Sequence, residues 1–264
     1  MTELGAVRRS PVAEAYDALA DHYDLLTMGY DHERWWQGLE PLLRRHGLRG
    51  RRVLDAACGT GRSLEPLLRR GYEASGCDVS PGMLERARER LGADVGLVVA
   101  DLRALPDLGR FDAITVLDDA MNYLLSERDL RSALASLRRL LAPRGLLVFD
   151  TNTLATYRGA FSGVRLAGDE DTLLCWRGHG IARRADATFA SVTVEAFARL
   201  DQELWRRRCS RHQQRHWSAE TLDAALRAAG LRLCERVGQR TGSRLGGPPD
   251  EDVHTKVVHV AARA

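Results

Sequence analysis

The stretch Val53-Leu54-Asp55-Ala56-Ala57-Cys58-Gly59-Thr60-Gly61-Arg62-Ser63 decides the fold of this chain. A short apolar strand carries an acidic residue and passes through a turn of small residues into a helical pattern, as in the first unit of a nucleotide-binding α/β sheet. Gly59 and Gly61 let the backbone approach a ligand, because glycine has no Cβ and adopts positive φ at little cost. The following helix would aim its free N–H groups at that ligand.

Three further apolar segments follow this stretch, and each leads into an acidic residue: residues 73–78 into Asp78, residues 95–100 into Asp101, and residues 111–117 into Asp118. The carboxyl ends of parallel strands meet at one edge of their sheet, where such sheets bind ligands. We therefore expect these acids to lie along a single binding site.

Four motifs stand in order along this half of the chain: Val-Leu-Asp-x-Ala-Cys-Gly-Thr-Gly at 53–61, Gly-Cys-Asp-Val-Ser-Pro-Gly-Met-Leu at 76–84, Ala-Asp-Leu at 100–102, and Phe-Asp-Ala-Ile-Thr-Val-Leu-Asp-Asp-Ala-Met-Asn-Tyr-Leu at 111–124. Together they resemble the class I S-adenosylmethionine-dependent methyltransferases. Dinucleotide dehydrogenases share this topology, but their phosphate loop has the spacing G-x-G-x-x-G, and Leu64 stands at its third glycine position. The resemblance implies an α/β fold with a seven-stranded Rossmann-like sheet and helices on both faces.

The resemblance also implies S-adenosylmethionine as cofactor, with S-adenosylhomocysteine as product, and a role for each matching position. Asp55 would orient the methionine amino group, and the Leu117 carbonyl would lie beside that amine. Asp78 would accept hydrogen bonds from both ribose hydroxyls, and Asp101 would accept one from the adenine amino group. The other implied cofactor positions are Ala57, Gly59 and Gly61 in the loop, Val79 and Met83 near the ribose, the N–H of Leu102 at the adenine ring, and Asp118. The family's first loop glycine is alanine here, at position 57, which tightens the loop.

Composition agrees with one soluble, enzyme-sized chain. It has 264 residues, of which 44% are hydrophobic, and a formal net charge of only +3. Its basic residues are almost all arginine, with Lys256 the only lysine. Five cysteines stand without C-x-x-C spacing, which favours reduced thiols and predicts no zinc or other metal site. No run approaches the roughly 18 apolar residues of a membrane span, so we expect a cytoplasmic protein with no membrane partner.

The N-terminal region is predicted to be helical after a polar, frayed segment at residues 1–10. Residues 12–26 carry Tyr16 and Tyr23 near helical spacing. These tyrosines either pack on the sheet or form a lid over the cofactor, and the resemblance supports the lid, where one hydroxyl would bond the cofactor or the acceptor. A second helix over residues 32–46 contains Trp35 and Trp36, of which only one is expected to face the core.

After Asn152 the hydrophobic period changes from helical to alternating. Residues 172–179, 188–199 and 202–217 are predicted to be extended, as an antiparallel insertion after the fifth strand. A helix over residues 218–229 and strands over residues 231–237 and 253–262 then complete the sheet. The expected domains are a helical lid at 1–50, a cofactor-binding core at 51–153 and 218–264, and an insertion at 154–217 that roofs the substrate or forms a dimer edge.

The acceptor is expected beyond the fourth strand. The segment Leu-Asp-Asp-Ala-x-Asn-Tyr-Leu at 117–124 is similar to bacterial small-molecule N-methyltransferases, including those that act on aminosugars. Asn122 would hold the amine and Tyr123 would pack against it. Unperturbed histidines have a pKa near 6.5, which suits proton removal, so His179, His212 and His216 in the insertion are candidate bases. The predicted catalytic set is Asn122, Tyr123, Asp118, His179 and Tyr23.

Four alternatives to small-molecule N-methylation stay open at this point, and the fourth of them is a non-catalytic module that keeps the fold and binds the cofactor without turnover. Asp118, Asp150 and Asn152 would also suit metal-assisted O-methylation, and O-methylation without a metal is a second alternative. The third is RNA or protein methylation through the basic cluster of residues 206–215. Alternate arginines on a strand point to opposite faces, so we favour a solvated strand or a homodimer edge for this cluster and expect no nucleic-acid partner. The leading hypothesis is a methyltransferase of natural-product or aminosugar type, with a small-molecule amine as its acceptor.

Overall fold

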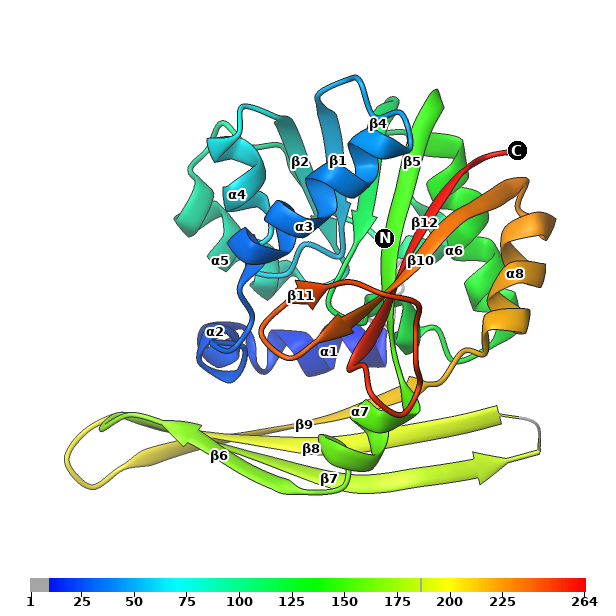
Figure 1. Ribbon diagram of the computed structural model, residues 1–264. Helices are drawn as coiled ribbons and strands as arrows, with labels where there is room; N and C mark the ends of the chain where they lie inside the picture. Colours follow the sequence, from blue (N-terminus) through cyan, green and yellow to red (C-terminus); the bar gives the residue numbers. More distant parts are fainter. Residues whose placement is uncertain (1–9, 186) are drawn as a thin grey trace, which may run out of the picture.

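The computed structural model describes residues 10–185 and 187–264, and most of the polar segment predicted at 1–10 lies outside them. The main sheet has eight strands in the order β11-β10-β12-β5-β4-β1-β2-β3 (Figure 1). Its strands are β1 (Arg52–Ala56), β2 (Glu73–Asp78), β3 (Leu97–Val99), β4 (Phe111–Val116), β5 (Leu141–Asn152), β10 (Leu231–Arg240), β11 (Arg244–Leu245) and β12 (Lys256–Arg263). β1 to β5 are parallel, and β12 is antiparallel to β5.

The methyltransferase-like α/β sheet with helices on both faces is confirmed, with one strand more than the seven expected. The additional strand is β11, which consists of two residues and pairs with the end of β10. It forms because the chain turns back at residues 241–243, where Gly242 and Ser243 have positive φ. The polar loop sequence around it carries no alternation that would predict a strand.

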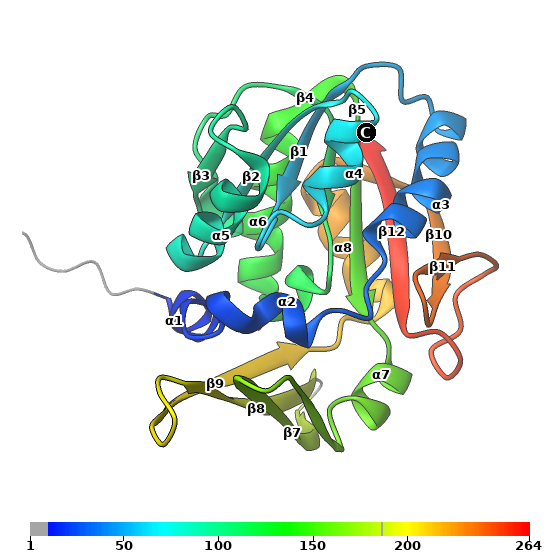
Figure 2. The same ribbon diagram turned by 90° about the vertical axis from the view of Figure 1, so that its left-hand side faces the viewer.

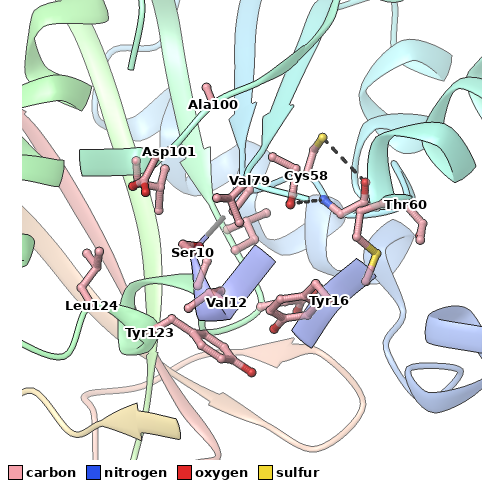
Figure 3. Close-up of a pocket in the computed structure, with 18 of the residues that line it drawn as sticks. Ser10, Val12, Tyr16, Cys58, Thr60, Val79, Ala100, Asp101, Tyr123 and Leu124 are labelled. Carbon is pink, nitrogen blue, oxygen red and sulfur yellow. Dashed lines mark hydrogen bonds between the residues drawn. The ribbon is translucent and has the colours of Figure 1, made fainter. Parts of the chain in front are cut away.

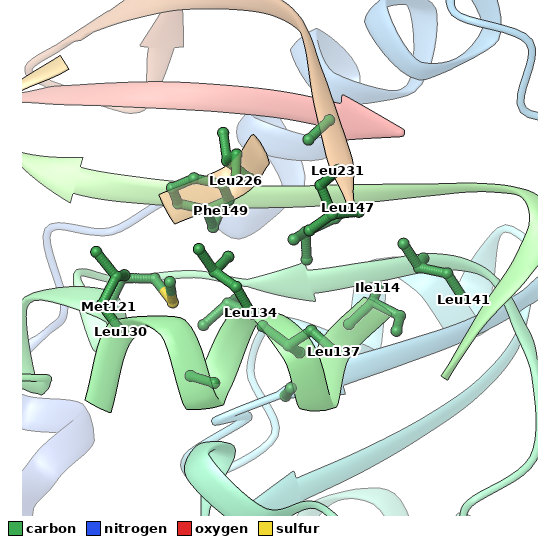
Figure 4. Packing of buried hydrophobic residues seen from close by; sticks show 14 of the residues in the cluster. Ile114, Met121, Leu130, Leu134, Leu137, Leu141, Leu147, Phe149, Leu226 and Leu231 are labelled. Atoms are coloured by element: carbon green, nitrogen blue, oxygen red, sulfur yellow. The ribbon is translucent and has the colours of Figure 1, made fainter. Parts of the chain in front are cut away.

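Each face of the sheet buries alternate residues of the central strands under helices. Val53, Ala113 and Val148 face α3 (His32–Arg45), α4 (Leu64–Arg69) and α5 (Pro81–Leu91). Their neighbours Leu54, Ile114 and Phe149 face α6 (Glu127–Leu140) and α8 (Ala219–Ala228) (Figure 4). This is the period of two that strands require, and it makes the sheet the middle layer of three.

Serine residues cap the starts of three helices in the structure. Ser80, Ser126 and Ser218 each accept a hydrogen bond from the backbone N–H three residues later, at the starts of α5, α6 and α8. The single helix predicted over residues 12–26 is instead broken into α1 (Pro11–Asp17), a 3₁₀ turn (Ala20–His22) and α2 (Tyr23–Leu26). Between these pieces Leu19 turns into the core of the insertion, where it is buried.

The prediction that only one of the two tryptophans faces the core is wrong, because both are buried in α3. Trp35 Nε1 donates to Gln239 Oε1 at 2.8 Å, and Trp36 Nε1 donates to the Ser63 carbonyl at 3.3 Å. Adjacent side chains on a helix point about 100° apart. Both are buried because α3 packs on one face of the main sheet and also contacts β11 and the end of β10 at the edge of that sheet.

The insertion forms a second sheet of four antiparallel strands in the order β6-β7-β8-β9. These are β6 (Val164–Gly168), β7 (Thr172–Arg184), β8 (Ala187–Arg199) and β9 (Trp205–Arg215), preceded by α7 (Leu154–Gly159). Three extended segments were expected, and β6 is the fourth; its side chains are mostly exposed, so it lacks a buried alternation. The second sheet lies across the carboxyl ends of the central strands, with α1 and α2 between the two sheets (Figures 1 and 2).

Candidate functional site

A cavity of about 280 Å³ follows the carboxyl ends of four neighbouring strands of the main sheet. Ala57 and Gly59 line it after β1, Asp78 and Val79 after β2, Asp101 and Leu102 after β3, and Leu117 and Asp118 after β4. The N-terminal segment closes it through Ser10, Val12, Tyr16, Tyr23 and His32 (Figure 3). In the strand order β4-β1-β2-β3, Asp118 and Asp101 therefore mark opposite ends of the cavity.

The loop after β1 uses its small residues for two different purposes. Gly59 has φ +54°, and a Cβ at this position would meet only the Tyr23 ring, at 3.9 Å, so Gly59 leaves space in the cavity. Gly61 does not line the cavity: a Cβ there would lie 2.8 Å from Leu91 Cδ1, so this glycine allows α5 to pack. The structure thus gives Gly61 a packing role, and its cofactor role stays a prediction. Ala57 lines the cavity with φ +69°, a conformation that is uncommon for any residue with a Cβ.

Asp78 is prepared by the fold to accept hydrogen bonds from a ligand. Its side chain is 8% exposed, and its two carboxylate oxygens accept from the N–H groups of Gly59 and Ser80, both at 2.9 Å. Burial raises the pKa of this carboxyl to about 6, although the backbone N–H groups act in the opposite direction. Each oxygen keeps acceptor capacity beyond these bonds, since a carboxylate offers about four acceptor sites.

Asp101 and Leu102 form the other end of the cavity, beside Val79 and Met83. Burial opposes ionisation of Asp101, but the Arg103 side chain, which donates to both carboxylate oxygens, holds its pKa below the usual range. Asp101 also accepts from the Arg103 N–H at 2.9 Å. An ionised acceptor next to an apolar slot suits the edge of an aromatic base.

Asp55 lies beneath the cavity and does not line it. It is almost fully buried, accepts from Thr115 Oγ1 at 2.7 Å and accepts from Ser63 Oγ. Burial raises its pKa to about 6, with the two hydroxyl donors opposing the shift. The structure therefore shows Asp55 joining β1, β4 and the start of α4, and its contact with a methionine amine stays a prediction.

The turn after β4 carries the densest group of charges in the site. Asp118 and Asp119 both adopt left-handed backbone conformations, with φ +56° and +59°. Their N–H groups donate to Asp150, at 2.9 and 2.6 Å. Lys256 Nζ lies 2.8 Å from Asp119 and 3.4 to 3.5 Å from Asp150 and Asp118. His32 Nε2 lies 2.8 Å from the second oxygen of Asp118.

The ionisation of this group follows from burial and from the lysine. Burial opposes the charge on Asp118, but Lys256 and His32 hold its pKa well below the usual range. Burial raises the pKa of Asp150 to about 7, against the opposing effect of Lys256. Burial also acts to lower the pKa of Lys256, yet the carboxylates of Asp119 and Asp150 raise it well above its usual value. The lysine is thus charged at neutral pH, and the sequence offered no signal for this contact beyond its being the only lysine.

Three tyrosines meet above the Asp118 end of the cavity. The Tyr16 ring lies 5.8 Å from Tyr23 and 5.4 Å from Tyr123, measured between centroids, and all three line the cavity (Figure 3). Behind them, on β9, His212 Nδ1 lies 3.1 Å from the Tyr123 hydroxyl. Burial lowers the pKa of His212 to about 4, so this imidazole is neutral at physiological pH. We call Tyr16, Tyr23 and Tyr123 the tyrosine wall.

Two predicted catalytic residues do not reach the cavity. Asn122 is 0% exposed; its amide donates to the Arg215 carbonyl at 2.8 Å and its oxygen accepts from the Asn152 N–H at 2.9 Å. Its role in holding an amine is therefore replaced by a role in joining β9 to β5. His179 is exposed on β7 and bonds Thr193 Oγ1 at 2.8 Å, outside the cavity, so it is no candidate base here. His216 likewise pairs with Glu251 rather than with a group in the cavity.

The arginine-rich strand β9 divides its side chains between two faces, as expected from strand geometry. Arg207 pairs with Glu195, and Arg215 stacks on Trp217 with 4.1 Å between the guanidinium carbon and the ring centroid. Arg206 and Arg211 are exposed. These arginines do not form one continuous surface with the cavity.

Within residues 10–185 and 187–264, no three His, Cys, Asp or Glu side chains are grouped so as to hold a metal ion.

Among the helices of the described residues, none has the length and apolar character that a membrane span requires.

Comparison with known proteins agrees with this geometry. Residues 53–145, which carry the loop after β1 and the ends of β2, β3 and β4, match the family described as "Methyltransferase domain". The chain carries a methyltransferase domain and is an enzyme that uses S-adenosylmethionine as its cofactor. The methyltransferase shares its fold with the crystal structure of an S-adenosylmethionine-dependent methyltransferase from Clostridium acetobutylicum, with a TM-score of 0.76 and 22% identity over 94% of this chain and 98% of that one.

The amino-acid sequence is also similar to those of two curated relatives. The Bacillus subtilis protein YqeM is 28% identical over 226 residues, which cover 83% of this chain and 87% of YqeM. The dTDP-3-amino-3,6-dideoxy-alpha-D-glucopyranose N,N-dimethyltransferase of Streptomyces fradiae is 32% identical over 142 residues, which cover 53% of this chain and 55% of that protein. The methyltransferase thus spans about half the length of this second relative.

The hydrogen-bond acceptors and the apolar residues of the cavity fit S-adenosylmethionine. Asp78 offers free acceptor capacity beside Gly59, where the missing Cβ leaves space, and Asp101 offers an ionised acceptor beside the apolar slot at Val79 and Met83. The cavity volume is near the lower end of small-molecule sites, which span roughly 300 to 1,000 Å³. Ribose hydroxyls would bond Asp78, and the adenine edge would meet Asp101 and Leu102.

Cofactor affinity is expected to fall in acid, because Asp78 must be ionised to accept from two hydroxyls. Its pKa of about 6 is raised relative to the usual 3.8, so the ionised fraction falls once the pH drops below about 6. We expect the dissociation constant of S-adenosylhomocysteine to be flat between about pH 7 and 8 and to rise toward tenfold per pH unit below about 6. Calorimetric titrations across this range measure it.

The matched variant for this prediction is Asp78→Asn, which cannot titrate. It should bind more weakly at neutral pH and lose most of the acid dependence, while circular dichroism confirms that both proteins stay folded. A variant that keeps the full acid dependence of the wild type would contradict the assignment to Asp78.

Proposed function

We propose that this enzyme transfers the methyl group to a small-molecule acceptor and that the accepting atom is an amine nitrogen. The observation that carries the proposal is the tyrosine wall next to the carboxylates of Asp118 and Asp119. Aromatic faces and carboxylates both attract cations, and an amine is a cation at neutral pH unless it has lost its proton. The similarity to the Streptomyces fradiae aminosugar N,N-dimethyltransferase supports this choice.

The size of the acceptor is limited by what covers the cavity. α1 and α2 lie between the carboxyl ends of the strands and the second sheet, and Tyr16 and Tyr23 from these helices close the Asp118 end. β9 then packs against α1 from outside, with Ser210, His212 and Gln214 buried. We propose that the described part of the N-terminal segment acts as a lid and that the insertion backs it. A folded RNA or protein would have to displace both to reach the cavity.

When bound, S-adenosylmethionine supplies a methyl group on a sulfonium, which an acceptor lone pair attacks in line with the sulfur–carbon bond. The chain's own residues would hold the two reactants in that line and exclude water, which can supply roughly 7–11 kcal/mol in favourable cases. Tyr123 would meet the acceptor, since its hydroxyl is held 3.1 Å from a neutral His212. With a pKa of about 4, His212 is a weak base, so its role is to orient Tyr123. An acceptor that arrives as an ammonium ion would lose its proton to water before it attacks the methyl group.

Removing the Tyr123 hydroxyl tests this arrangement. We expect Tyr123→Phe to lower kcat/KM for the acceptor by roughly tenfold, the cost of one hydrogen bond of about 1.4 kcal/mol, with the KM for S-adenosylmethionine unchanged. Tyr157→Phe is the control, because Tyr157 is a buried tyrosine outside the cavity whose hydroxyl has no hydrogen-bond partner among the described residues. Steady-state kinetics with each substrate varied in turn measure both variants.

The experiment that tests the function itself is transfer of labelled methyl from S-adenosylmethionine to separate pools of small metabolites, total RNA and protein. Label in the small-molecule pool, followed by mass spectrometry of the product, is the expected result. A nitrogen acceptor also predicts that kcat/KM rises with pH up to the acceptor's own pKa, because only the free amine has a lone pair. Label in RNA or protein, or a product methylated on oxygen, would overturn the proposal.

A further inference from the structure

The one lysine of this sequence is almost entirely buried beneath the Asp118 end of the cavity. Lys256 begins β12 and is 2% exposed. Its ammonium group faces three carboxylates, those of Asp118, Asp119 and Asp150, and lies 5.1 Å from the centroid of the Tyr30 ring. Removing one partner from such a buried group is strongly destabilising for the groups that remain.

These contacts join Lys256 to the backbone turn that ends β4. Asp118 and Asp119 are both left-handed, which costs free energy for residues with a Cβ. The turn persists because Asp150 accepts both of its N–H groups, and Lys256 neutralises part of the charge that Asp150 and Asp119 bring. Asp119 has a further tie to the insertion, since it accepts a hydrogen bond from Gln214 on β9. The lysine therefore stabilises a strained turn from below.

That turn forms one end of the cofactor cavity. Leu117 and Asp118 line the cavity, whereas Asp119, Asp150 and Lys256 do not. Asp118 lies at the end of the cavity opposite Asp101. If the adenine binds at Asp101, the methionine part would therefore lie at the Asp118 end. A change in the turn would thus alter contacts with the methionine part and leave the adenosine part in place.

We propose that Lys256 is a positioning residue that fixes the Asp118–Asp119 turn for the methionine part of the cofactor. The proposal rests on cofactor binding in this cavity as given above. Lys256 touches neither reactant; it acts through the turn. The ammonium group of Lys256 and the amino group of the methionine part are both positive and repel each other. If the lysine contributed only its charge, its removal would therefore strengthen binding of the cofactor. Positioning and charge balance therefore predict opposite signs.

Two ligands separate the parts of the cofactor. S-adenosylhomocysteine carries the whole amino-acid part, and 5′-methylthioadenosine carries only the adenosine and the sulfur. We expect Lys256→Met to weaken binding of S-adenosylhomocysteine at least tenfold and binding of 5′-methylthioadenosine less than twofold, measured by calorimetry. Equal loss for both ligands, or tighter binding of S-adenosylhomocysteine, would overturn the proposal. Lys256→Arg keeps the charge and should recover part of the selective loss.

The matched control is Arg236→Met on the neighbouring strand β10. Arg236 also pairs with a carboxylate, Asp223, at 2.6 Å, and its Nε donates to His259, but it lies outside the cavity. This variant should change the affinity for both ligands less than twofold, even if it lowers the melting temperature. A selective loss for S-adenosylhomocysteine in this control as well would show that general loss of stability, not Lys256, causes the effect.

A second measurement needs no variant. Because the sequence has one lysine, protein labelled with lysine that carries ¹³C only at Cε has a single lysine side-chain signal in its NMR spectrum. That signal should shift when S-adenosylhomocysteine is added and stay in place with 5′-methylthioadenosine. If neither ligand binds the wild-type protein in calorimetry, the cofactor assignment fails; if both bind and the lysine signal responds equally to both or to neither, only the role of Lys256 fails.

Discussion

Replacement of Asp78 by alanine is expected to weaken binding of S-adenosylhomocysteine at least about 100-fold. The carboxylate would accept hydrogen bonds from two ribose hydroxyls, and hydrogen bonds to a charged group contribute about 1.5–3 kcal/mol each, where 1.4 kcal/mol is a factor of ten. The same side chain also holds the N–H groups of Gly59 and Ser80. Its loss therefore removes the ligand's acceptor and loosens the loop after β1 together. Calorimetry or displacement of a fluorescent cofactor analogue measures the change.

The matched control for this variant is Asp112→Ala. Asp112 is another aspartate whose carboxylate accepts from a backbone N–H, that of Arg52 at 3.0 Å, but it lies at the opposite end of the sheet strands, before the apolar part of β4. This control should lose some stability and keep its affinity within about twofold. Affinity in Asp78→Ala that resembles the wild type would refute the assignment of Asp78 to the ribose. A similar loss in Asp112→Ala would show that any weakening of the sheet is sufficient.

Replacement of Phe149 by alanine is expected to lower the free energy of unfolding by about 3–5 kcal/mol. Phe149 is 0% exposed on β5, lies in the cluster under α6 and α8, and stacks on His259 with 4.6 Å between ring centroids and an angle of 8° between planes (Figure 4). The side chains around Phe149 come from several elements, so movement of one element would not fill the space that the truncated side chain leaves. Urea denaturation followed by circular dichroism measures the loss.

Leu166→Ala serves as the comparison for this stability change. Leu166 is a large apolar residue of the second sheet that is 66% exposed, so its truncation should change the unfolding free energy by no more than about 0.5 kcal/mol. Phe149 also precedes Asp150, which accepts the two N–H groups of the turn at the Asp118 end. A loss below about 1 kcal/mol for Phe149→Ala would mean that the core beneath this turn is far looser than its packing indicates.

The loop after β1 and the ends of β2 and β3 could be predicted from sequence because their signals are local. Parallel strands with polar ends share one edge by geometry alone, so Asp78 and Asp101 had to meet without knowledge of the packing. The helix starts at Ser80, Ser126 and Ser218 depend on contacts over three residues, which a sequence displays directly. The same local rules failed for short elements, because their sequence does not determine the direction in which their side chains point. Asn122 sits on a 3₁₀ turn that aims it at β9 rather than into the cavity.

The contacts that complete the site join distant segments. His212 is 89 residues from Tyr123, and Lys256 is 106 residues from Asp150. His179 shows why alternation alone was insufficient: β7 has a register shift between Gly178 and Ile181, so the face on which a side chain lies depends on the pairing with β8. A histidine in an extended segment carries no sign of which face will be covered.

The sequence by itself thus determined the α/β core and the placement of Asp78 and Asp101 along one cavity, because spacing along one strand–loop–helix unit and the direction of parallel strands leave little freedom. Only the tertiary structure decided which residues complete the other end of the cavity. Its tyrosine wall and the lysine beneath the Asp118–Asp119 turn exist because α1, the second sheet and β12 pack around one strained turn, and packing between segments so far apart is set by the whole fold.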